Sequence, residues 1–210
     1  MKKIMFNDHY GLTEAVLSGR KTQTRRVIPQ SVVKKASEYQ LKYFEATLDA
    51  ISEREAIEQL YFVERLANLP YQVGEVVAVA QCYAGAGFGD TAPIIGADEN
   101  DMPIFASEVG VYNKMFVRAD LMPHRIRITN VRVERLQDIS DADCIAEGVI
   151  KGRVGSEGTH FMDAYYVPNM PLEPHVLPQG AYAALIDRIS GKGVWENNPY
   201  VFVYDFELVK

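Results

Sequence analysis

The chain has 210 residues, of which 48% are apolar and 24% charged, a composition typical of a globular domain rather than a disordered or fibrous chain. Its two cysteines, Cys82 and Cys144, exclude a disulfide framework and argue against a cysteine-rich zinc site. No stretch reaches the roughly 18 apolar residues that a bilayer-spanning helix needs, and the N-terminal segment turns polar before a signal peptide could form. We therefore expect a cytoplasmic protein with no membrane partner.

The formal net charge of −6 is unevenly distributed along the chain. Residues 1–35 contain eight Lys and Arg residues against two acidic ones, which gives +6, and the remaining 175 residues carry −12. A positive potential decays over about 8 Å at physiological salt, so the basic segment keeps a local attraction for anions. This distribution disfavours a long RNA track and favours a small ligand in a local pocket.

The N-terminal segment predicts a short helix followed by a strand. Residues 11–18 have one apolar face, with Thr13 as a candidate N-cap. Gly19 is suited to the left-handed backbone that ends a helix. Residues 22–28 are rich in Thr and β-branched side chains, which favours a strand that ends at Pro29.

The next part of the chain predicts two helices, a strand and an irregular segment. Residues 34–69 have helical apolar spacing, with a break near Ser52. Gly74 is expected in a turn before a strand at 75–81. Residues 84–113 hold seven Gly and Pro residues and predict a long, irregular excursion.

The strand expected at residues 125–134 contains a shift in its apolar phase. Ile126 and Ile128 alternate with polar residues, and the alternation then continues at Val131 and Val133. A slip of one residue is what a β-bulge produces, because the extra residue restores the inward direction of the following side chains. We infer a bent strand that suits a small closed barrel.

The C-terminal part predicts two helices and a final strand. Ser140 is a candidate cap for a helix that Gly148 closes. Residues 151–180 are expected to be loop-like, 182–189 helical and 200–208 a strand. Strands and helices do not alternate regularly, so we predict an α+β fold with a bent, mostly antiparallel sheet.

Two patterns that suggest a cofactor or a metal do not hold. Residues 85–89 read Gly-Ala-Gly-Phe-Gly, but the dinucleotide fingerprint needs a third Gly where Asp90 stands, and we interpret this segment as a loop. The four histidines, at positions 9, 124, 160 and 175, lack a second His or Cys at helical or hairpin spacing. We expect neither a cofactor nor a metal.

The segment from Gly19 to Arg26 gathers cations and hydroxyls at a helix-to-strand turn. Such a turn is suited to bind a phosphate or a nucleobase carbonyl. It is also suited to activate a nucleophile, because a partly buried Lys beside other cations has a lowered pKa and can take a proton from a Thr hydroxyl. The alternative is a solvated basic turn with structural Arg residues.

This segment resembles the signature of the ASCH domain family, a branch of the PUA-like superfamily. The signature residues are Gly19, Lys21, Thr24 and Arg26. Further segments are similar to the second strand, to the following strand and helix, and to the ending of longer phage- and prophage-type members. These segments are residues 73–77, 133–140, 146–149 and 195–201.

The resemblance implies a PUA-like small β-barrel with a cleft, flanking helices and inserted helical and loop segments. The family is associated with RNA, and some small members are amidohydrolases that deacetylate acetylcytidine nucleosides. Their roles transfer to Lys21 as base, Thr24 as nucleophile and Glu147 as acid. Glu147 would lie near the negative end of a helix dipole, which suits a general acid, or it would be a structural carboxylate beside a loop. The ligand-binding candidates are Gly19, Arg20, Arg25 and Arg26.

The chain is expected to form a single domain over 1–210, with insertions at about 30–70, 84–115 and 151–180. Three functions are considered. The first is a module that binds RNA or a modified nucleoside, and the second is an amidohydrolase acting on an acylated nucleoside such as N(4)-acetylcytidine. The third is a non-catalytic phage or prophage module that contacts another protein. We favour a cleft that binds a nucleotide-like ligand, and whether the protein also hydrolyses that ligand stays open.

Overall fold

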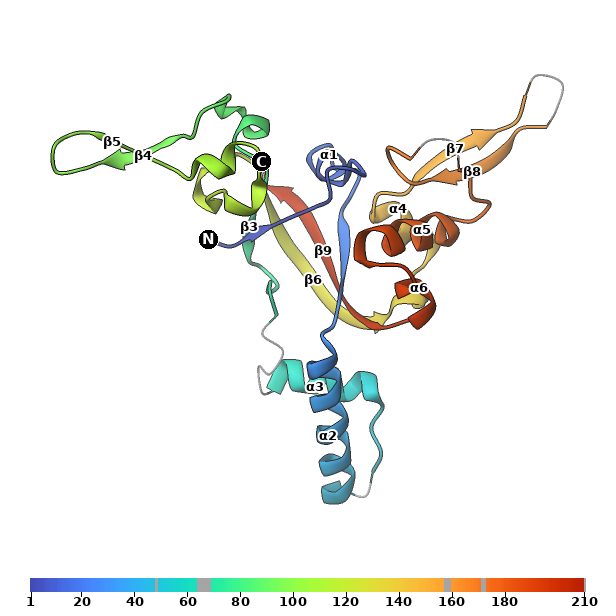
Figure 1. Ribbon diagram of the computed structural model, residues 1–210. Helices are drawn as coiled ribbons and strands as arrows, with labels where there is room; N and C mark the ends of the chain where they lie inside the picture. The colour runs from blue at the N-terminus through green and yellow to red at the C-terminus, as the bar shows by residue number, and fades with distance from the viewer. Residues whose placement is uncertain (48, 64–68, 157–159, 171–172, 210) are drawn as a thin grey trace.

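The computed structural model describes residues 1–47, 49–63, 69–156, 160–170 and 173–209. Their strands form three separate sheets (Figure 1). The strands are β1 (Lys3–Ile4), β2 (Gln23–Val27), β3 (Val76–Val79), β4 (Ile94–Ala97), β5 (Pro103–Phe105), β6 (Arg125–Arg135), β7 (Ile150–Val154), β8 (Met162–Tyr166) and β9 (Tyr200–Val209). The helices are α1 (Leu12–Leu17), α2 (Gln30–Thr47), α3 (Glu53–Val63), α4 (Asp141–Ala146), α5 (Pro178–Ser190) and α6 (Val194–Asn197), with a π-helical turn at Ala84–Phe88 and 3-10 turns at Glu108–Val111, Lys114–Phe116, Ala119–Leu121 and Leu136–Asp138.

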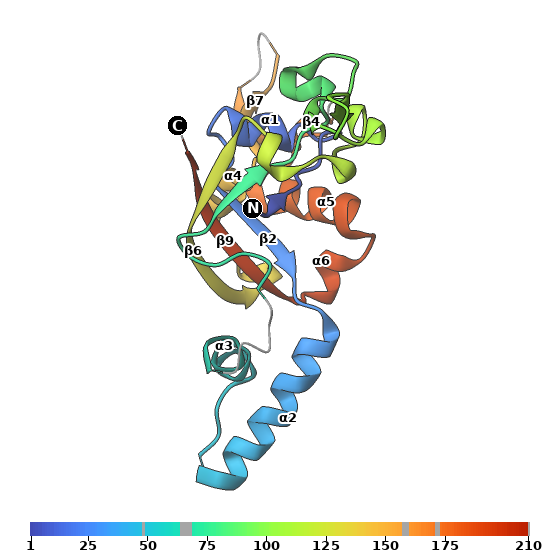
Figure 2. The same ribbon diagram turned by 90° about the vertical axis from the view of Figure 1, so that its left-hand side faces the viewer.

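The main sheet has five strands in the order β1-β3-β6-β9-β2. The β1–β3 pair is parallel and the other pairs are antiparallel. β6 and β9 form its long central ladder, which runs from Arg125 opposite Val209 to Arg135 opposite Tyr200. Both strands curve along their length (Figures 1 and 2).

The β-bulge expected in this long strand is confirmed. Ile128 pairs with Phe206, but it is Asn130 that pairs with Asp205, so Thr129 is the extra residue on β6. The bulge lets Ile128 before it and Val133 after it both enter the core. It also sets Arg132 and Glu134 on the opposite face of the strand, where Glu134 contacts Arg25 of β2 and Arg132 contacts Asp205 of β9.

The prediction of an α+β fold built on a small closed β-barrel is wrong, because the main sheet stays open in the described residues. β1 and β2 are its two edges and do not pair with each other. β1 has two residues, and the chain leaves the sheet from Met5 onward. Where a barrel would have a further ladder, Arg26 Nη2 donates a hydrogen bond to Met5 O at 2.7 Å. The fold is a mixed α/β arrangement with three open sheets.

The N-terminal elements agree with the prediction except at one cap. α1 and β2 lie where they were expected, and Gly19 between them has a left-handed φ of +74°. Thr13 is not the N-cap, because it lies inside α1 and its hydroxyl donates to Phe6 O at 3.3 Å. Gly11 occupies the cap position instead.

The helices α2 and α3 pack against each other and project from the main sheet as an arm (Figures 1 and 2). The predicted break near Ser52 is confirmed, and its cause is a reciprocal cap. Ser52 Oγ accepts from Glu55 N at 3.2 Å, and Glu55 Oε2 accepts from Ser52 N at 2.7 Å. Of the predicted helical stretch, residues 48 and 64–68 lie outside the described residues.

The hairpins β4–β5 and β7–β8 lie in segments that were predicted to be irregular. Most of their side chains are exposed, so the apolar alternation that marks a half-buried strand is absent from their sequences. Residues 157–159 and 171–172 of the predicted loop lie outside the described residues. The arm and the hairpins fall within the expected insertions, and the single-domain layout stays a prediction.

Two helices complete the core next to β2. Ser140 Oγ accepts from Asp143 N at 3.1 Å, so the predicted cap of α4 is confirmed, and Gly148 follows α4 with a φ of +111°. α5 buries Leu185 and Ile186, as predicted. α4 and α5 pack against each other, and α4 also contacts β2.

Candidate functional site

A cavity of about 270 Å³ lies beside β2, between this strand, the segment that follows β1, and α5. Its wall is mostly apolar, and β2 and the residue after α4 supply most of its charged groups. The lining residues are Met5, Phe6, Asn7, Leu12, Lys21, Thr24, Arg25, Arg26, Val27, Glu147, Tyr182, Leu185, Ile186, Ile189, Ser190 and Val194.

β2 presents a free backbone edge at this cavity. Thr22 and Ile28, at its two ends, bond the backbone of β9 at 2.8 and 2.9 Å. In an antiparallel ladder the bonded residues alternate, so the N–H and C=O groups of Gln23, Arg25 and Val27 point away from β9. Gln23 O accepts from Lys21 Nζ at 2.7 Å, so Arg25 and Val27 are the residues whose main-chain donors and acceptors the open sheet leaves along this edge.

Lys21 follows the Gly19 turn and is 2% exposed. Its ammonium donates to Glu147 Oε2 at 2.6 Å, to Glu147 O at 2.8 Å and to Gln23 O at 2.7 Å. Burial lowers the pKa of Lys21; the Glu147 carboxylate opposes this, while the charges of Arg26 and Arg25 add to it. Lys21 is thus placed to pass a proton to the carboxylate that it contacts.

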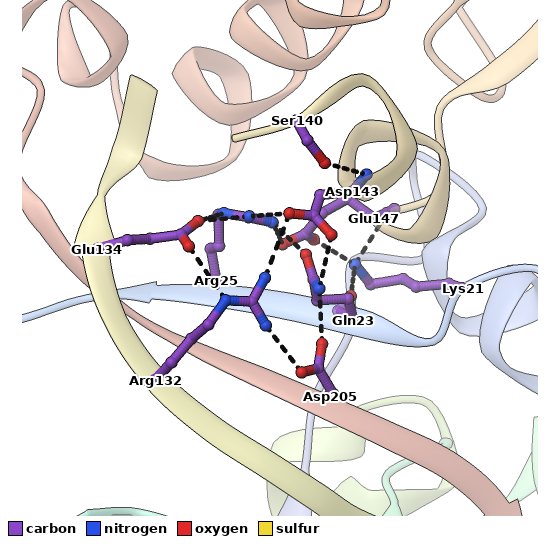
Figure 3. A network of polar contacts seen from close by, with 9 residues as sticks. All are labelled: Lys21, Gln23, Arg25, Arg132, Glu134, Ser140, Asp143, Glu147 and Asp205. Carbon is purple, nitrogen blue, oxygen red and sulfur yellow. Dashed lines mark hydrogen bonds and ion pairs between the residues drawn. The ribbon is translucent and has the colours of Figure 1, made fainter. Parts of the chain in front are cut away.

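Arg25 is the centre of a buried network of ion pairs (Figure 3). Its Nε and Nη2 donate to Glu134 Oε1 at 3.0 and 2.5 Å, and Nη2 also donates to Asp143 Oδ2 at 3.2 Å. Its Nη1 donates to Glu147 Oε1 at 3.2 Å and to Gln23 Oε1. Burial acts to lower the pKa of Arg25, but the negative charge of its neighbours, first of all Glu147, outweighs burial and the guanidinium stays charged.

Arg132 and Asp205 close the network on its more exposed side (Figure 3). Arg132 donates to Glu134 Oε2 at 3.1 Å and to Asp205 Oδ2 at 2.8 Å, and Gln23 Nε2 donates to Asp143 and Asp205 at 3.0 and 2.6 Å. The whole network has a formal charge of −1, so the positive charge of the basic turn is neutralised here. Its charged members are Lys21, Arg25, Arg132, Glu134, Asp143, Glu147 and Asp205.

Thr24 lines the same cavity and is 5% exposed. Within the described residues its hydroxyl makes no hydrogen bond to another group, and its oxygen is not among the fully buried polar atoms that lack a partner. The buried thiol of Cys144 does not compete as a nucleophile, because burial raises its pKa to about 12. The Thr24 hydroxyl is therefore available to a ligand in the cavity.

Two aromatic rings face the cations of the cavity. The Phe6 ring centroid lies 5.8 Å from Lys21 Nζ, and the Tyr182 ring centroid lies 5.9 Å from Arg25 Cζ. Burial raises the pKa of Tyr182 well above its ordinary value, with Glu147 adding to the shift, so its phenol stays neutral. The cavity thus combines apolar walls with a charged end.

The remaining predicted ligand-binding residues are divided between two places. Arg26 lines the cavity and is half-buried. Gly19 and Arg20 are exposed, and Arg20 borders a different depression together with Ile145 and Lys151. The structure therefore brings Lys21, Thr24, Arg25, Arg26 and Glu147 to one cavity, and it does not bring Gly19 or Arg20 there.

Sequence reasoning missed six residues of the site. Tyr182 lines the cavity, and the other five support the network: Gln23, Arg132, Glu134, Asp143 and Asp205. The alternation of Arg132 and Glu134 with Val131 and Val133 was a usable signal, since it sets charges on the face of β6 opposite the core. Their partners on β2 and α4 follow only from the tertiary fold.

Within the described residues no group of three or more His, Cys, Asp or Glu side chains could hold a metal ion. In that same part of the chain, none of the helices combines the length and apolar character that crossing a bilayer requires. The chain matches no family model, no curated protein and no solved structure. The resemblance to the ASCH family therefore stays a prediction.

Proposed function

We propose that the protein is an amidohydrolase of the ASCH type that removes an acyl group from the amine of a small nucleoside-like molecule. The proposal rests on Lys21, Thr24 and Glu147, which line one cavity although Glu147 is 126 positions from Lys21. Lys21 Nζ lies 2.6 Å from Glu147 Oε2, and the Thr24 hydroxyl is unbonded within the described residues. A nucleophile, a base and an acid at one cavity are the groups that acyl transfer needs.

The protons balance within this set of residues. Transfer of a proton from Lys21 Nζ to Glu147 Oε2 leaves a neutral amine and a carboxylic acid. The amine takes the proton of the Thr24 hydroxyl while Oγ1 bonds to the acyl carbon, and Glu147 protonates the amine that leaves as the C–N bond breaks. Water then cleaves the acyl ester on Thr24, which releases a carboxylic acid and restores the hydroxyl.

The cavity favours a small, partly planar substrate. Its volume of about 270 Å³ excludes a long polymer, and the rings of Phe6 and Tyr182 offer apolar faces. The free edge of β2 offers backbone groups for the polar rim of a base, and Arg26 adds one cation. RNA as an extended ligand is disfavoured because Lys21 and Arg25 are already paired with carboxylates.

The first test is turnover of acylated amines. Purified protein should release the free amine from N(4)-acetylcytidine or another acylated nucleoside in a panel, followed by liquid chromatography. Thr24→Val should lower kcat by about 10³-fold because it removes the attacking oxygen, whereas Thr24→Ser should keep measurable turnover.

Thr22→Ala is the matched control, since Thr22 lies on the same segment but is exposed. It should stay within about twofold of the wild-type rate, and thermal unfolding should show that all variants are folded. Unchanged turnover in folded Thr24→Val would exclude Thr24 as the nucleophile. Absence of turnover on every amide of the panel would count against hydrolysis itself.

A further inference from the structure

Glu147 has a separate cation on each carboxylate oxygen. Oε2 contacts Lys21 Nζ at 2.6 Å, and Oε1 contacts Arg25 Nη1 at 3.2 Å. The side chains of Lys21 and Arg25 are 1% and 0% exposed, and that of Glu147 is 5% exposed. Because water is excluded, a charge on one partner acts strongly on the others.

The orientation of Arg25 is fixed from three elements. Its five N–H groups meet acceptors on Gln23 from β2, on Glu134 from β6, and on Asp143 and Glu147 at the two ends of α4. A guanidinium whose donors are all engaged cannot rotate without losing several hydrogen bonds. Arg25 therefore holds Glu147 Oε1 in one position and keeps a permanent positive charge beside the Lys21–Glu147 pair.

Other charged or titratable groups, from several helices and strands, also surround the Lys21–Glu147 pair. They are Arg26 on β2, Glu134 on β6, Asp143 and Cys144 on α4, Tyr182 on α5, and Arg132 and Asp205 in the outer part of the network. Arg25 is the positive member that contacts Glu147 directly in addition to Lys21. A change of its charge should therefore alter the pair more than a change in the outer network.

We propose that Arg25 is a positioning residue that orients Glu147 and sets the pH at which Lys21 loses its proton. It does not touch the substrate in this scheme and acts through Glu147 and Lys21. Its effect on turnover rests on the proposed hydrolysis, whereas its effect on the Lys21 titration does not. The two effects can therefore be measured separately.

The direct readout is the titration of Lys21 Nζ, followed by NMR on lysine-labelled protein and assigned with Lys21→Arg. Arg25→Gln removes a positive charge near the ammonium, so the Lys21 midpoint should rise by about one pH unit. In the proposed scheme the Lys21–Glu147 pair must hold one proton, so kcat/KM falls as the pH rises through the Lys21 midpoint, and this falling limb should move to higher pH by the same amount. Arg25→Lys keeps the positive charge but loses the planar guanidinium with its several N–H donors. The Lys21 midpoint should therefore return to the wild-type value, while kcat stays reduced at an unchanged KM.

Asp143→Asn should shift the Lys21 midpoint in the opposite direction, and it supplies a second test if Arg25→Gln does not fold. It removes a negative charge from the network, so the Lys21 midpoint should fall, by less than Arg25→Gln raises it. Arg135→Lys is the matched control, because Arg135 pairs with Glu53 away from the cavity. It should leave both the Lys21 titration and the pH profile unchanged.

The outcomes separate this proposal from the proposed function. Opposite shifts of the Lys21 midpoint in Arg25→Gln and Asp143→Asn support the positioning role, even if no amide is turned over. If Arg25→Gln does not fold, a fall in Asp143→Asn together with a wild-type midpoint in Arg25→Lys supports it equally. A Lys21 midpoint that does not move in any folded variant of Arg25 or Asp143 would overturn it, whatever the turnover.

Discussion

The Asp143 side chain connects Gln23 and Arg25 of β2 with Arg132 of β6. Its carboxylate accepts hydrogen bonds from Gln23, Arg25 and Arg132, and its backbone N–H donates to the Ser140 cap. Burial acts to raise the pKa of Asp143, but the Gln23 hydrogen bond and the charges of Arg25 and Arg132 outweigh it, so the pKa lies below its ordinary value. Its ionised form therefore stabilises the folded state.

The sign of this coupling gives a prediction for acid unfolding. Because the folded-state pKa of Asp143 is lowered, its contribution is present above the unfolded value of about 3.9 and is lost as pH falls through the folded value. Asp143→Asn should be less stable than wild type at pH 7, and the difference should shrink as the pH falls below about 4. Urea unfolding at a series of pH values measures the difference in the free energy of unfolding and its change with pH.

Asp120→Asn is the control for this series, since Asp120 also pairs with an arginine, Arg118 at 2.7 Å, but on the surface. Its loss should change the free energy of unfolding little at any pH, because water and salt screen an exposed pair. A constant difference between Asp143→Asn and wild type from pH 7 to acid would contradict the lowered pKa.

Short elements carry the catalytic candidates, and their ends are tied to the sheet. α4 has six residues, too few to be stable alone, and Glu147 stands directly after it. Ser140 caps its first turn, and Ala146 O at its other end accepts from Thr22 N at 2.9 Å. Gly148 lets the chain after α4 pass close to α1, because a Cβ at position 148 would lie 3.2 Å from Leu12 Cδ2.

The cap of α4 yields a prediction at the scale of the element. Ser140→Ala should lower the free energy of unfolding by about 1 kcal/mol, because the N–H of Asp143 loses its acceptor. It should also lower turnover at temperatures where the variant is folded, because α4 carries Glu147. Ser140→Asp should retain most of both properties, since Asp is an equally good N-cap.

Ser37→Ala provides the comparison, because Ser37 lies inside α2 and bonds only Val33 O of its own helix within the described residues. It should stay close to wild type in stability and in turnover. Equal effects of the Ser37 and Ser140 changes would show that the cap has no special role.

At the scale of the whole molecule, charge separates a local site from a nucleic-acid surface. The basic residues of the 19–26 segment that lie deepest, Lys21 and Arg25, are paired with carboxylates, and Arg20 and Arg26 are the more exposed ones. The remainder of the chain beyond residue 35 carries −12. A broad positive face is therefore not expected to meet an RNA strand.

Salt dependence tests this expectation. Binding of a long single-stranded RNA, measured by fluorescence anisotropy at several salt concentrations, should be weak, with a log–log slope no steeper than about −2. The reason is that each contacted phosphate adds roughly −0.7 to the slope for single strands, and few cations are free. A slope of about −5 or steeper, reduced by Arg20→Ala or Arg26→Ala, would instead support an RNA-binding surface.

Local patterns in the sequence were sufficient for much of the secondary structure. The apolar spacing of 11–18, the Ser140 cap and the phase slip before Val131 each act over a few residues, so a short window contains their cause. Lys21, Thr24 and Glu147 came from a resemblance, which named residue types but not their environment. The exposed hairpins left no such pattern, because neither of their faces is buried as a core strand would be.

Only the tertiary structure decided whether the sheet closes and what surrounds Lys21. Closure depends on β1 and β2 meeting across the molecule, and β1 ends after two residues, while a cavity lined by α5 and the segment after β1 lies beside β2 instead. Arg25 meets Glu134 across 109 positions and Glu147 across 122, which no local pattern specifies. These pairings depend on burial, which brings distant charges together and makes each one need a partner.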